Sequence, residues 1–294
     1  MSIADPARDA VVEPAPPEPT PTPPTRIIRP SSGWRGLDLA SVWKHRDLVF
    51  FLAWRDIRLR YRQTLLGVAW AVVQPVTTMI VFSVFFGQLA KMPSDGLPYP
   101  LFSLCALLPW QLFAYALTES SNSLVNNKHI ITKVYFPRLI VPLASVVAGL
   151  MDFAVAFVLL LIMMAYYGVW PGIEVLILPL LLLLALTTAL GVGLWLATLN
   201  VRYRDVRYTL PFLTQVWLFV TPIAYPSSLV SADLRPLLGL NPMAGVVEGF
   251  RWALLGTGQP PNALILVSAG VALVALVSGL YFFRRLERTF ADIL

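Results

Sequence analysis

Long apolar stretches separated by short polar connections make up most of this chain. Six stretches, of 18 to 29 residues, cover 64–90, 101–118, 139–167, 173–199, 208–230 and 262–283. A helix needs about 20 predominantly apolar residues to cross a hydrocarbon core of about 30 Å. The pattern therefore predicts an all-α membrane protein with six transmembrane helices.

A further helix is expected ahead of the first span, within residues 34–63. Between residues 41 and 63 two stripes recur at helical spacing, one apolar (Phe50, Trp54, Ile57 and Tyr61) and one basic (Arg55, Arg58 and Arg62). Such a helix lies in the membrane surface, with its arginines against anionic headgroups and Trp54 and Tyr61 as interfacial anchors. The alternative is that these arginines only flank the first span on its cytoplasmic side.

Residues 236–258 form an apolar segment that is too short and too interrupted to span a membrane. Five apolar residues within it have helical spacing: Met243, Val246, Val247, Phe250 and Leu254. We expect a re-entrant helical hairpin that dips into the outer leaflet between the fifth and sixth spans.

Composition and charge support a membrane protein and set its orientation. The chain is 57% hydrophobic and only 13% charged, too apolar for the surface of a soluble domain. Nineteen of the 22 Lys and Arg residues precede the first span or lie in alternate connections, leaving Lys91, Arg235 and Arg251 on the other side. The positive-inside rule then predicts cytoplasmic termini in a bacterial inner membrane. It also explains the net charge of +6 without any binding of nucleic acid.

The N-terminal region differs from the rest in composition. Nine of the 25 prolines fall within the first 30 residues, a composition that favours disordered chain. We expect a disordered cytoplasmic tail over 1–33 and no cleavable signal peptide, because no apolar core opens the chain. A six-helix domain over 64–286 and a cytoplasmic end over 287–294 would complete the organisation.

The sequence holds little that points to catalysis. None of its four lysines belongs to a phosphate-binding loop of the Gly-x4-Gly-Lys-Ser/Thr type. His45, His129 and the single cysteine, Cys105, form no cluster with metal-ligand spacing. A membrane glycosyltransferase would need more charged residues in its external loops than this chain offers: Glu174, Asp233, Arg235, Glu248 and Arg251. Any ATP must therefore be hydrolysed by another subunit.

Two features inside the spans are candidates for function. Asp152 lies near the middle of the third span and Glu119 at the end of the second. A carboxylate at that depth is either a proton relay or hydrogen-bonded to another helix, and we favour the second because no Arg, Lys or His lies within the spans. Aromatic residues that could stack on sugar rings occur in the first and fifth spans: Trp70, Phe82, Phe85, Phe86, Phe212, Trp217, Phe219 and Tyr225.

Nearly the whole chain after Trp34 resembles the permeases of type-2 ABC exporters that move O-antigen, teichoic acid and capsule polymers. The resemblance rests on RLRYRQTLLGVAWAVVQPVTTMIVF (58–82), NNKHIITKVYFPRLIVPLA (126–144), NVRYRDVRYTLPFLTQVWLFVTPIAYP (200–226), NPMAGVVEGFRWALLG (241–256) and ERTFADIL (287–294). It implies a homodimer that works with two copies of a cytoplasmic ATPase subunit, which would bind ATP and Mg. No cofactor would bind this chain itself.

The resemblance also implies residue roles. A coupling helix would enter a cleft of the ATPase and would consist of Asn126, Asn127, Lys128, Ile130, Ile131, Lys133, Tyr135, Phe136 and Arg138, with Val134. The first and fifth spans would line a channel between the protomers. The external gate would include Asn241, Met243, Phe250 and Arg251. The cargo would be a polyprenyl-linked polysaccharide, and we hypothesise that Arg55, Arg58 and Arg62 receive its pyrophosphate.

Two other functions remain open at this stage. A proton-coupled carrier would use Asp152 as its relay and would need no ATPase. A permease of the same superfamily for drugs or other small molecules would fit the predicted spans, although it would explain the aromatic first and fifth spans less well.

Overall fold

The computed structural model describes residues 39–62, 67–134, 136–231, 235–257, 260 and 263–290. These residues form helices and turns, and no strand occurs among them, which confirms the all-α fold. They belong to a single unit that spans 37–294. The predicted tail, 1–33, lies outside the described residues.

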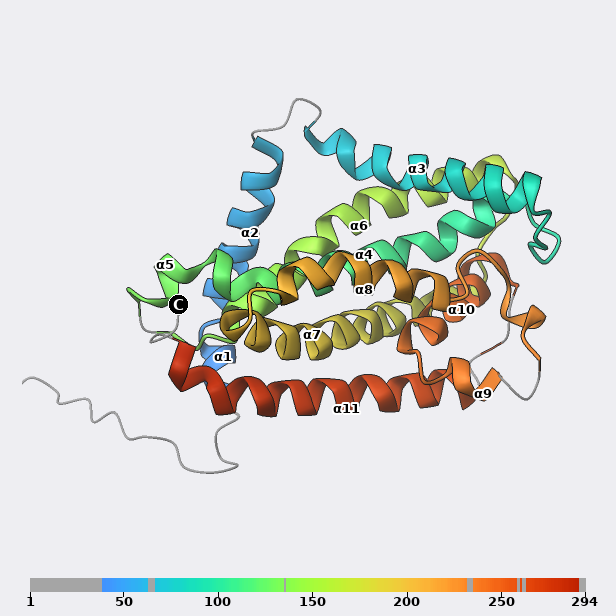
Figure 1. Ribbon diagram of the computed structural model, residues 1–294. Coiled ribbons are helices and arrows are strands. Elements are labelled where there is room, and N and C mark those ends of the chain that lie inside the picture. The colour runs from blue at the N-terminus through green and yellow to red at the C-terminus, as the bar shows by residue number, and fades with distance from the viewer. Residues whose placement is uncertain are drawn as a thin grey trace, which may run out of the picture. The chain divides into compact units, whose positions relative to one another are not determined.

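Five helical segments of the described chain are long and apolar enough to cross a membrane (Figure 1). They are α3 (Trp70–Phe82) with a π-helical continuation η3 (Ser83–Leu89), α4 (Tyr99–Asn126), α6 (Ile140–Tyr166), the 3-10 turn η4 (Ile173–Ile177) with α7 (Leu178–Arg202), and α11 (Ala263–Leu286). They correspond to the first four and the last of the predicted spans.

The predicted fifth span is occupied by a shorter helix, α8 (Val206–Val220). Its 15 residues rise about 22 Å at 1.5 Å per residue, less than the hydrocarbon thickness. The helix ends because Pro222 forces the preceding Thr221 out of the helical region, to a ψ of 135°. The structure therefore does not confirm a sixth helix of spanning length. After α8 the chain continues through a turn to a 3-10 segment, η5 (Ser227–Leu229).

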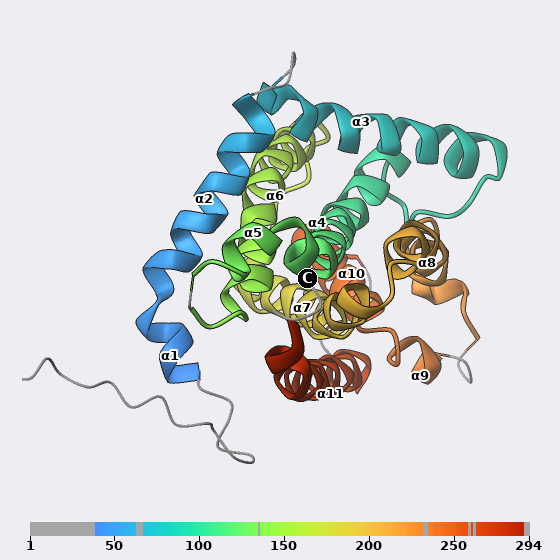
Figure 2. The same ribbon diagram turned by 60° about the vertical axis from the view of Figure 1, so that its left-hand side comes forward.

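Helix α4 is the central helix of the unit (Figure 2). It packs against α6, α7, α10, α3 and α8, and most of its residues are buried. The predicted end at residue 118 is wrong by eight residues, because the polar residues that follow are buried by protein. Ser121 and Ser123 donate hydrogen bonds to carbonyls of their own helix, which lets the helix continue to Asn126.

Helices α7 and α11 approach each other closely at two glycines. A Cβ added to Gly191 would lie 2.6 Å from the backbone nitrogen of Leu276, and one added to Gly279 would collide with the carbonyl of Gly191. Small residues at facing positions let two membrane helices pack backbone to backbone. This contact fixes the last span against the fourth.

Two helices precede the spans. The short α1 (Leu39–Lys44) leads into α2 (Arg46–Arg62), which runs across the direction of α4, α7 and α11 (Figure 1). Leu52 and Ala53 are buried on α2, which packs against α6, while Phe50 and Trp54 are exposed. A 3-10 turn, η2 (Gly67–Ala69), precedes α3. The crosswise direction of α2 is the one expected of an interfacial helix.

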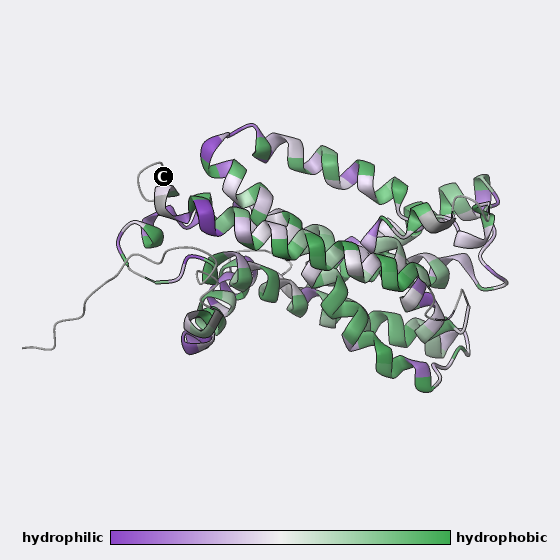
Figure 3. Cartoon of the chain, turned by 90° about the horizontal axis from the view of Figure 1, so that it is seen from below, coloured by the Kyte–Doolittle hydropathy of each residue, from purple (hydrophilic) through white to green (hydrophobic). Residues whose placement is uncertain are grey.

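The remaining short elements lie at the two ends of the long helices (Figure 1). One end carries α5 (Lys128–Ile131) and the 3-10 turn η6 (Glu287–Thr289) that follows α11. The other carries α9 (Arg235–Leu238) and α10 (Pro242–Leu255). Figure 3 shows hydrophilic residues gathered around the C-terminal end and on α2, and mostly hydrophobic residues along the long helices.

Candidate functional site

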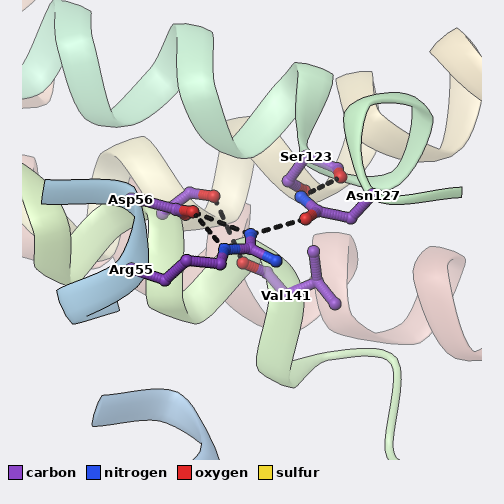
Figure 4. A network of polar contacts seen from close by, with 6 residues as sticks. Arg55, Asp56, Ser123, Asn127 and Val141 are labelled. Carbon is purple, nitrogen blue, oxygen red and sulfur yellow. Dashed lines mark hydrogen bonds and ion pairs between the residues drawn. The ribbon is translucent and has the colours of Figure 1, made fainter. Parts of the chain in front are cut away.

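An arginine of α2 reaches the segment between α4 and α6 (Figure 4). Arg55 Nη2 donates to Asp56 Oδ1 at 2.7 Å and to Asn127 Oδ1 at 2.6 Å. Asn127 Nδ2 in turn donates to the carbonyl of Ser123 at 2.9 Å. The crosswise helix is thus hydrogen-bonded to the first residues of the predicted coupling helix. Because Arg55 is committed to these partners, it is less available to an external ligand than the exposed Arg58 and Arg62.

A second polar contact joins α2 to the middle of α6. Arg60 Nη1 donates to Asp152 Oδ2, and the hydroxyl of Tyr61 donates to Asp152 Oδ1. The Arg60 guanidinium also lies 4.1 Å from the centre of the Tyr115 ring. The prediction that Asp152 is hydrogen-bonded to another helix is confirmed, and no Arg, Lys or His of the spans takes part. The partner comes from α2, outside the spans.

The segment 126–138 only partly presents the apolar surface expected of a coupling helix. Lys128, Lys133 and Val134 are exposed, and Ile130 is half-buried. Ile131 and Phe136 are buried in a cluster of the chain's own core, which corrects the expectation that they are offered to a partner. Tyr135 lies outside the described residues, whereas Asn126 at the end of α4 is exposed and Arg138 is half-buried.

Three of the four predicted gate residues are buried in the fold, and Asn241 is half-buried. Met243, Phe250 and Arg251 have exposed fractions of 0%. Asn241 caps α10 by accepting from the backbone nitrogen of Met243 at 3.1 Å. Its Oδ1 also accepts from Trp217 Nε1 at 2.8 Å, and its Nδ2 donates to Thr221 Oγ1 at 3.0 Å. Helix α10 is therefore bonded to the end of α8.

Arg251 strengthens the same connection. Its Nη1 donates to the carbonyl of Pro222 at 2.7 Å and its Nη2 to that of Ile223 at 2.8 Å. The guanidinium lies 3.7 Å from the centre of the Phe102 ring. Arg251 Nη1 lies 3.4 Å from Glu248 Oε1. Burial lowers the pKa of Arg251, and the neighbouring Glu248 opposes this shift. Arg251 thus satisfies two carbonyls of the turn that follows α8.

The eight candidate aromatic residues do not share one environment. Four are exposed on α3, η3 and α8: Trp70, Phe85, Phe212 and Phe219. The other four pack against the core: Phe82 is buried, and Phe86, Trp217 and Tyr225 are partly buried. The ring centroids of Phe82 and Phe86 lie 5.2 Å apart. Trp217 meets Phe113 edge-on, with 4.9 Å between their ring centroids. The first four are therefore the most accessible to a ligand in this arrangement.

The described residues show no metal site, since no three of their His, Cys, Asp or Glu side chains gather to hold an ion. The chemistry they do show is that of binding and of helix positioning. One polar contact holds α2 against the residue that follows α4, and another holds it against the middle of α6. At the end of α8, a buried arginine and a capping asparagine hold α10 in place.

Comparison with known proteins agrees with this architecture. The O-antigen export system permease protein RfbA of Myxococcus xanthus is 28% identical over 253 residues, covering 85% of this chain and 96% of that protein. RfbA of Klebsiella pneumoniae is 28% identical over 250 residues, 84% and 95% of the two chains. The polysialic acid transport protein KpsM of Escherichia coli is 24% identical over 239 residues, 79% and 91%. Residues 47–255, from α2 to the end of α10, match the ABC-2 type transporter family, to which this chain belongs.

Proposed function

We propose that this chain is the membrane-spanning subunit of an ATP-driven exporter that moves a lipid-linked polysaccharide from the cytoplasm across the bacterial inner membrane. The observation that carries the proposal is the match, over 91% to 96% of their lengths, to permeases named for O-antigen export and polysialic acid transport. The sequence has no phosphate-binding loop of its own. Such a chain needs an ATPase partner that binds ATP and Mg.

Two copies of that ATPase would meet segment 126–138, one on each permease protomer. Lys128, Lys133 and Val134 are exposed there and offer charge and a small apolar contact. The hydrogen bond from Arg55 to Asn127 would pass movement of this segment to α2. Tyr135 would add to the contact as the resemblance implies.

A homodimer would provide the translocation path between two copies of α3 and α8. Both helices expose apolar and aromatic side chains, including Trp70, Phe85, Phe212 and Phe219. A polar glycan cannot enter hydrocarbon because each unsatisfied hydroxyl costs several kcal/mol. Paired α3 and α8 faces would shield the glycan, and their ring faces would stack on sugars without requiring one linkage.

The topology we propose has six crossings and both termini in the cytoplasm. Helix α8 runs back along α7 in the opposite direction, toward the end that carries α9 and α10 (Figure 1), so it brings the chain across even though it is short. The basic residues of the α4–α6 and α7–α8 connections and of the end of α11 would face the cytoplasm. Helix α10 would form the re-entrant external element.

Arg58 and Arg62 are the better candidates for the pyrophosphate of the lipid carrier. Both are exposed on α2, and the Arg58 guanidinium lies 5.8 Å from the Trp54 ring centre, beside an exposed aromatic surface suited to the membrane interface. Arg55 would act instead through its bond to Asn127. The proton-carrier alternative loses support, since both oxygens of Asp152 already accept hydrogen bonds.

Deletion of the gene in its own organism tests the proposal. We expect the surface polysaccharide to disappear and a lipid-linked polymer to accumulate on the cytoplasmic side, with both effects reversed by the intact gene. A normal polysaccharide coat in the deletion strain would contradict the proposal.

A further inference from the structure

The C-terminal end of α11 is bound to the segment that we expect to contact the ATPase. Glu287 follows α11 directly, in η6. Its Oε1 accepts from the backbone nitrogen of Arg138 at 3.2 Å, and its Oε2 accepts from Arg284 Nη1 at 2.9 Å. Its carbonyl also accepts from Arg138 Nη1. One residue thus joins the end of the last span to the end of segment 126–138, 149 positions away.

The carboxylate of Glu287 also lies near the start of α6. Helix α6 begins at Ile140, and Leu139 at its N-cap position makes no side-chain capping bond. A carboxylate near the start of a helix accepts from its open N–H groups and interacts favourably with the positive end of the helix dipole. The first N–H groups of α6 have backbone partners, such as Pro137 for Ile140, and Glu287 accepts from Arg138, two residues before the helix begins. Its carboxylate therefore holds the approach to α6 against the end of α11 and places a negative charge near the start of the helix.

Apolar packing reinforces the polar contact. Phe290 is 1% exposed and meets Phe283 edge-on at 5.2 Å. Both rings belong to the cluster that contains Ile131, Phe136 and Leu139 of the segment between α4 and α6. A side chain buried to this extent stabilises the contact because its apolar surface is removed from water. The connection therefore has a charged part at Glu287 and a packed part at Phe290.

We infer that Glu287 and Phe290 are positioning residues that connect the ATPase-contacting segment to the last span. Movement of segment 126–138 during the ATPase cycle then reaches α11 directly, as well as α4 and α6. Since α11 packs against α7 at Gly191 and Gly279, the movement also reaches the fourth span. This inference rests on the proposed function, because it needs an ATPase partner.

The test compares Glu287→Ala with Arg285→Ala, both co-expressed with the proposed partner, an ABC ATPase subunit from the same organism. Arg285 is exposed and lies two positions away, so it serves as the matched control. Three quantities are measured: the amount of chain in the membrane, the ATPase that copurifies with it, and the polysaccharide exported per ATP hydrolysed. The last ratio responds to coupling and not to the amount of folded protein.

We expect Glu287→Ala to accumulate and to retain its ATPase while the ratio of export to hydrolysis falls roughly fivefold or more. Arg285→Ala should match the unaltered chain. The double variant Arg138→Ala with Glu287→Ala should be no worse than the more severe single variant, because the two residues act together. Phe290→Ala should also lower the ratio.

An unchanged ratio in Glu287→Ala would overturn the inference. So would loss of Glu287→Ala and of Glu287→Gln from the membrane while Arg285→Ala persists, since Glu287 would then only hold the fold together. Failure of the proposed function would look different, because the unaltered chain would then retain no ATPase and export nothing in response to ATP.

Discussion

Arg60 on α2 forms an ion pair with Asp152 on α6, 92 residues further along the chain. The carboxylate is near the middle of the third span, where an unpaired charge would be costly. The crosswise helix supplies the neutralising charge, and Tyr61 supplies a second hydrogen bond. The depth of Asp152 and the position of α2 therefore depend on each other.

Replacing this carboxylate should loosen α2. We expect Asp152→Asn to lower the free energy of unfolding by about 1 to 2 kcal/mol, because charge-assisted bonds to Arg60 and Tyr61 become weaker neutral ones. Asp47→Asn is the control, since Asp47 is 97% exposed and lies 3.9 Å from Arg46. Thermal unfolding in detergent micelles measures both. Equal melting temperatures for the two variants would contradict a structural role for the Arg60 pair.

Helix α11 offers a test of close packing with its own internal control. Gly279→Val should destabilise the chain by about 1 to 3 kcal/mol, because the added carbons would collide with the Gly191 carbonyl on α7. Gly270→Val on the same helix should be nearly neutral, since open space surrounds Gly270. Comparing the melting temperatures of the two variants tests this prediction. A larger loss in Gly270→Val would mean that α11 does not pack on α7 as described.

The bond between α8 and α10 can be tested at Asn241. Asn241→Ala removes the cap of α10 and the bonds to Trp217 and Thr221, and should cost about 1 to 2 kcal/mol. Loss of the indole bond should also shift the fluorescence emission of Trp217. As a control, Thr209→Ala removes only a bond to a carbonyl of the adjacent turn. Identical spectra and stabilities in the two variants would rule out this connection.

The exposed arginines of α2 should matter for the cargo rather than for the fold. Reversing both charges (Arg58→Glu with Arg62→Glu) should lower surface polysaccharide about tenfold or more, since each charge-assisted bond to a phosphate contributes 1.5 to 3 kcal/mol. Arg46→Glu, at the other end of the same helix, should have little effect. Quantitative immunoblotting of the polymer provides the measurement. Full export by the double variant would exclude these two residues from pyrophosphate binding.

Hydropathy alone located most of the spans. The third predicted span, 139–167, and the observed α6, Ile140–Tyr166, differ by one residue at each end, because lipid-facing helices must be apolar along their whole length. The prediction was less accurate where protein replaces lipid. Helix α4 continues past residue 118 because its polar residues are buried against neighbours. Pro222 indicates that α8 ends early, but the apolar residues on both sides of it led to the prediction of a longer span.

The candidate site was harder to predict because its partners are distant in sequence. Arg60 lies between Arg58 and Arg62 in the same basic helix, and nothing in the sequence singles it out for Asp152. Similarly, Ile131 and Phe136 have the apolar character expected of an ATPase contact, yet the chain's own core buries them. Periodicity shows that a side chain is apolar, whereas tertiary packing decides whether it faces a partner.

The most direct test of the proposed export function is transport in proteoliposomes that contain this chain and its proposed partner, an ABC ATPase subunit from the same organism. Lipid-linked polysaccharide and ATP are supplied on the ATPase side, with no proton gradient, and the polymer that becomes protected inside is measured. We predict ATP-dependent accumulation that stops when the ATPase is omitted. A second preparation omits the ATPase and carries an imposed proton gradient. Accumulation there that is abolished by Asp152→Asn would contradict the proposed function.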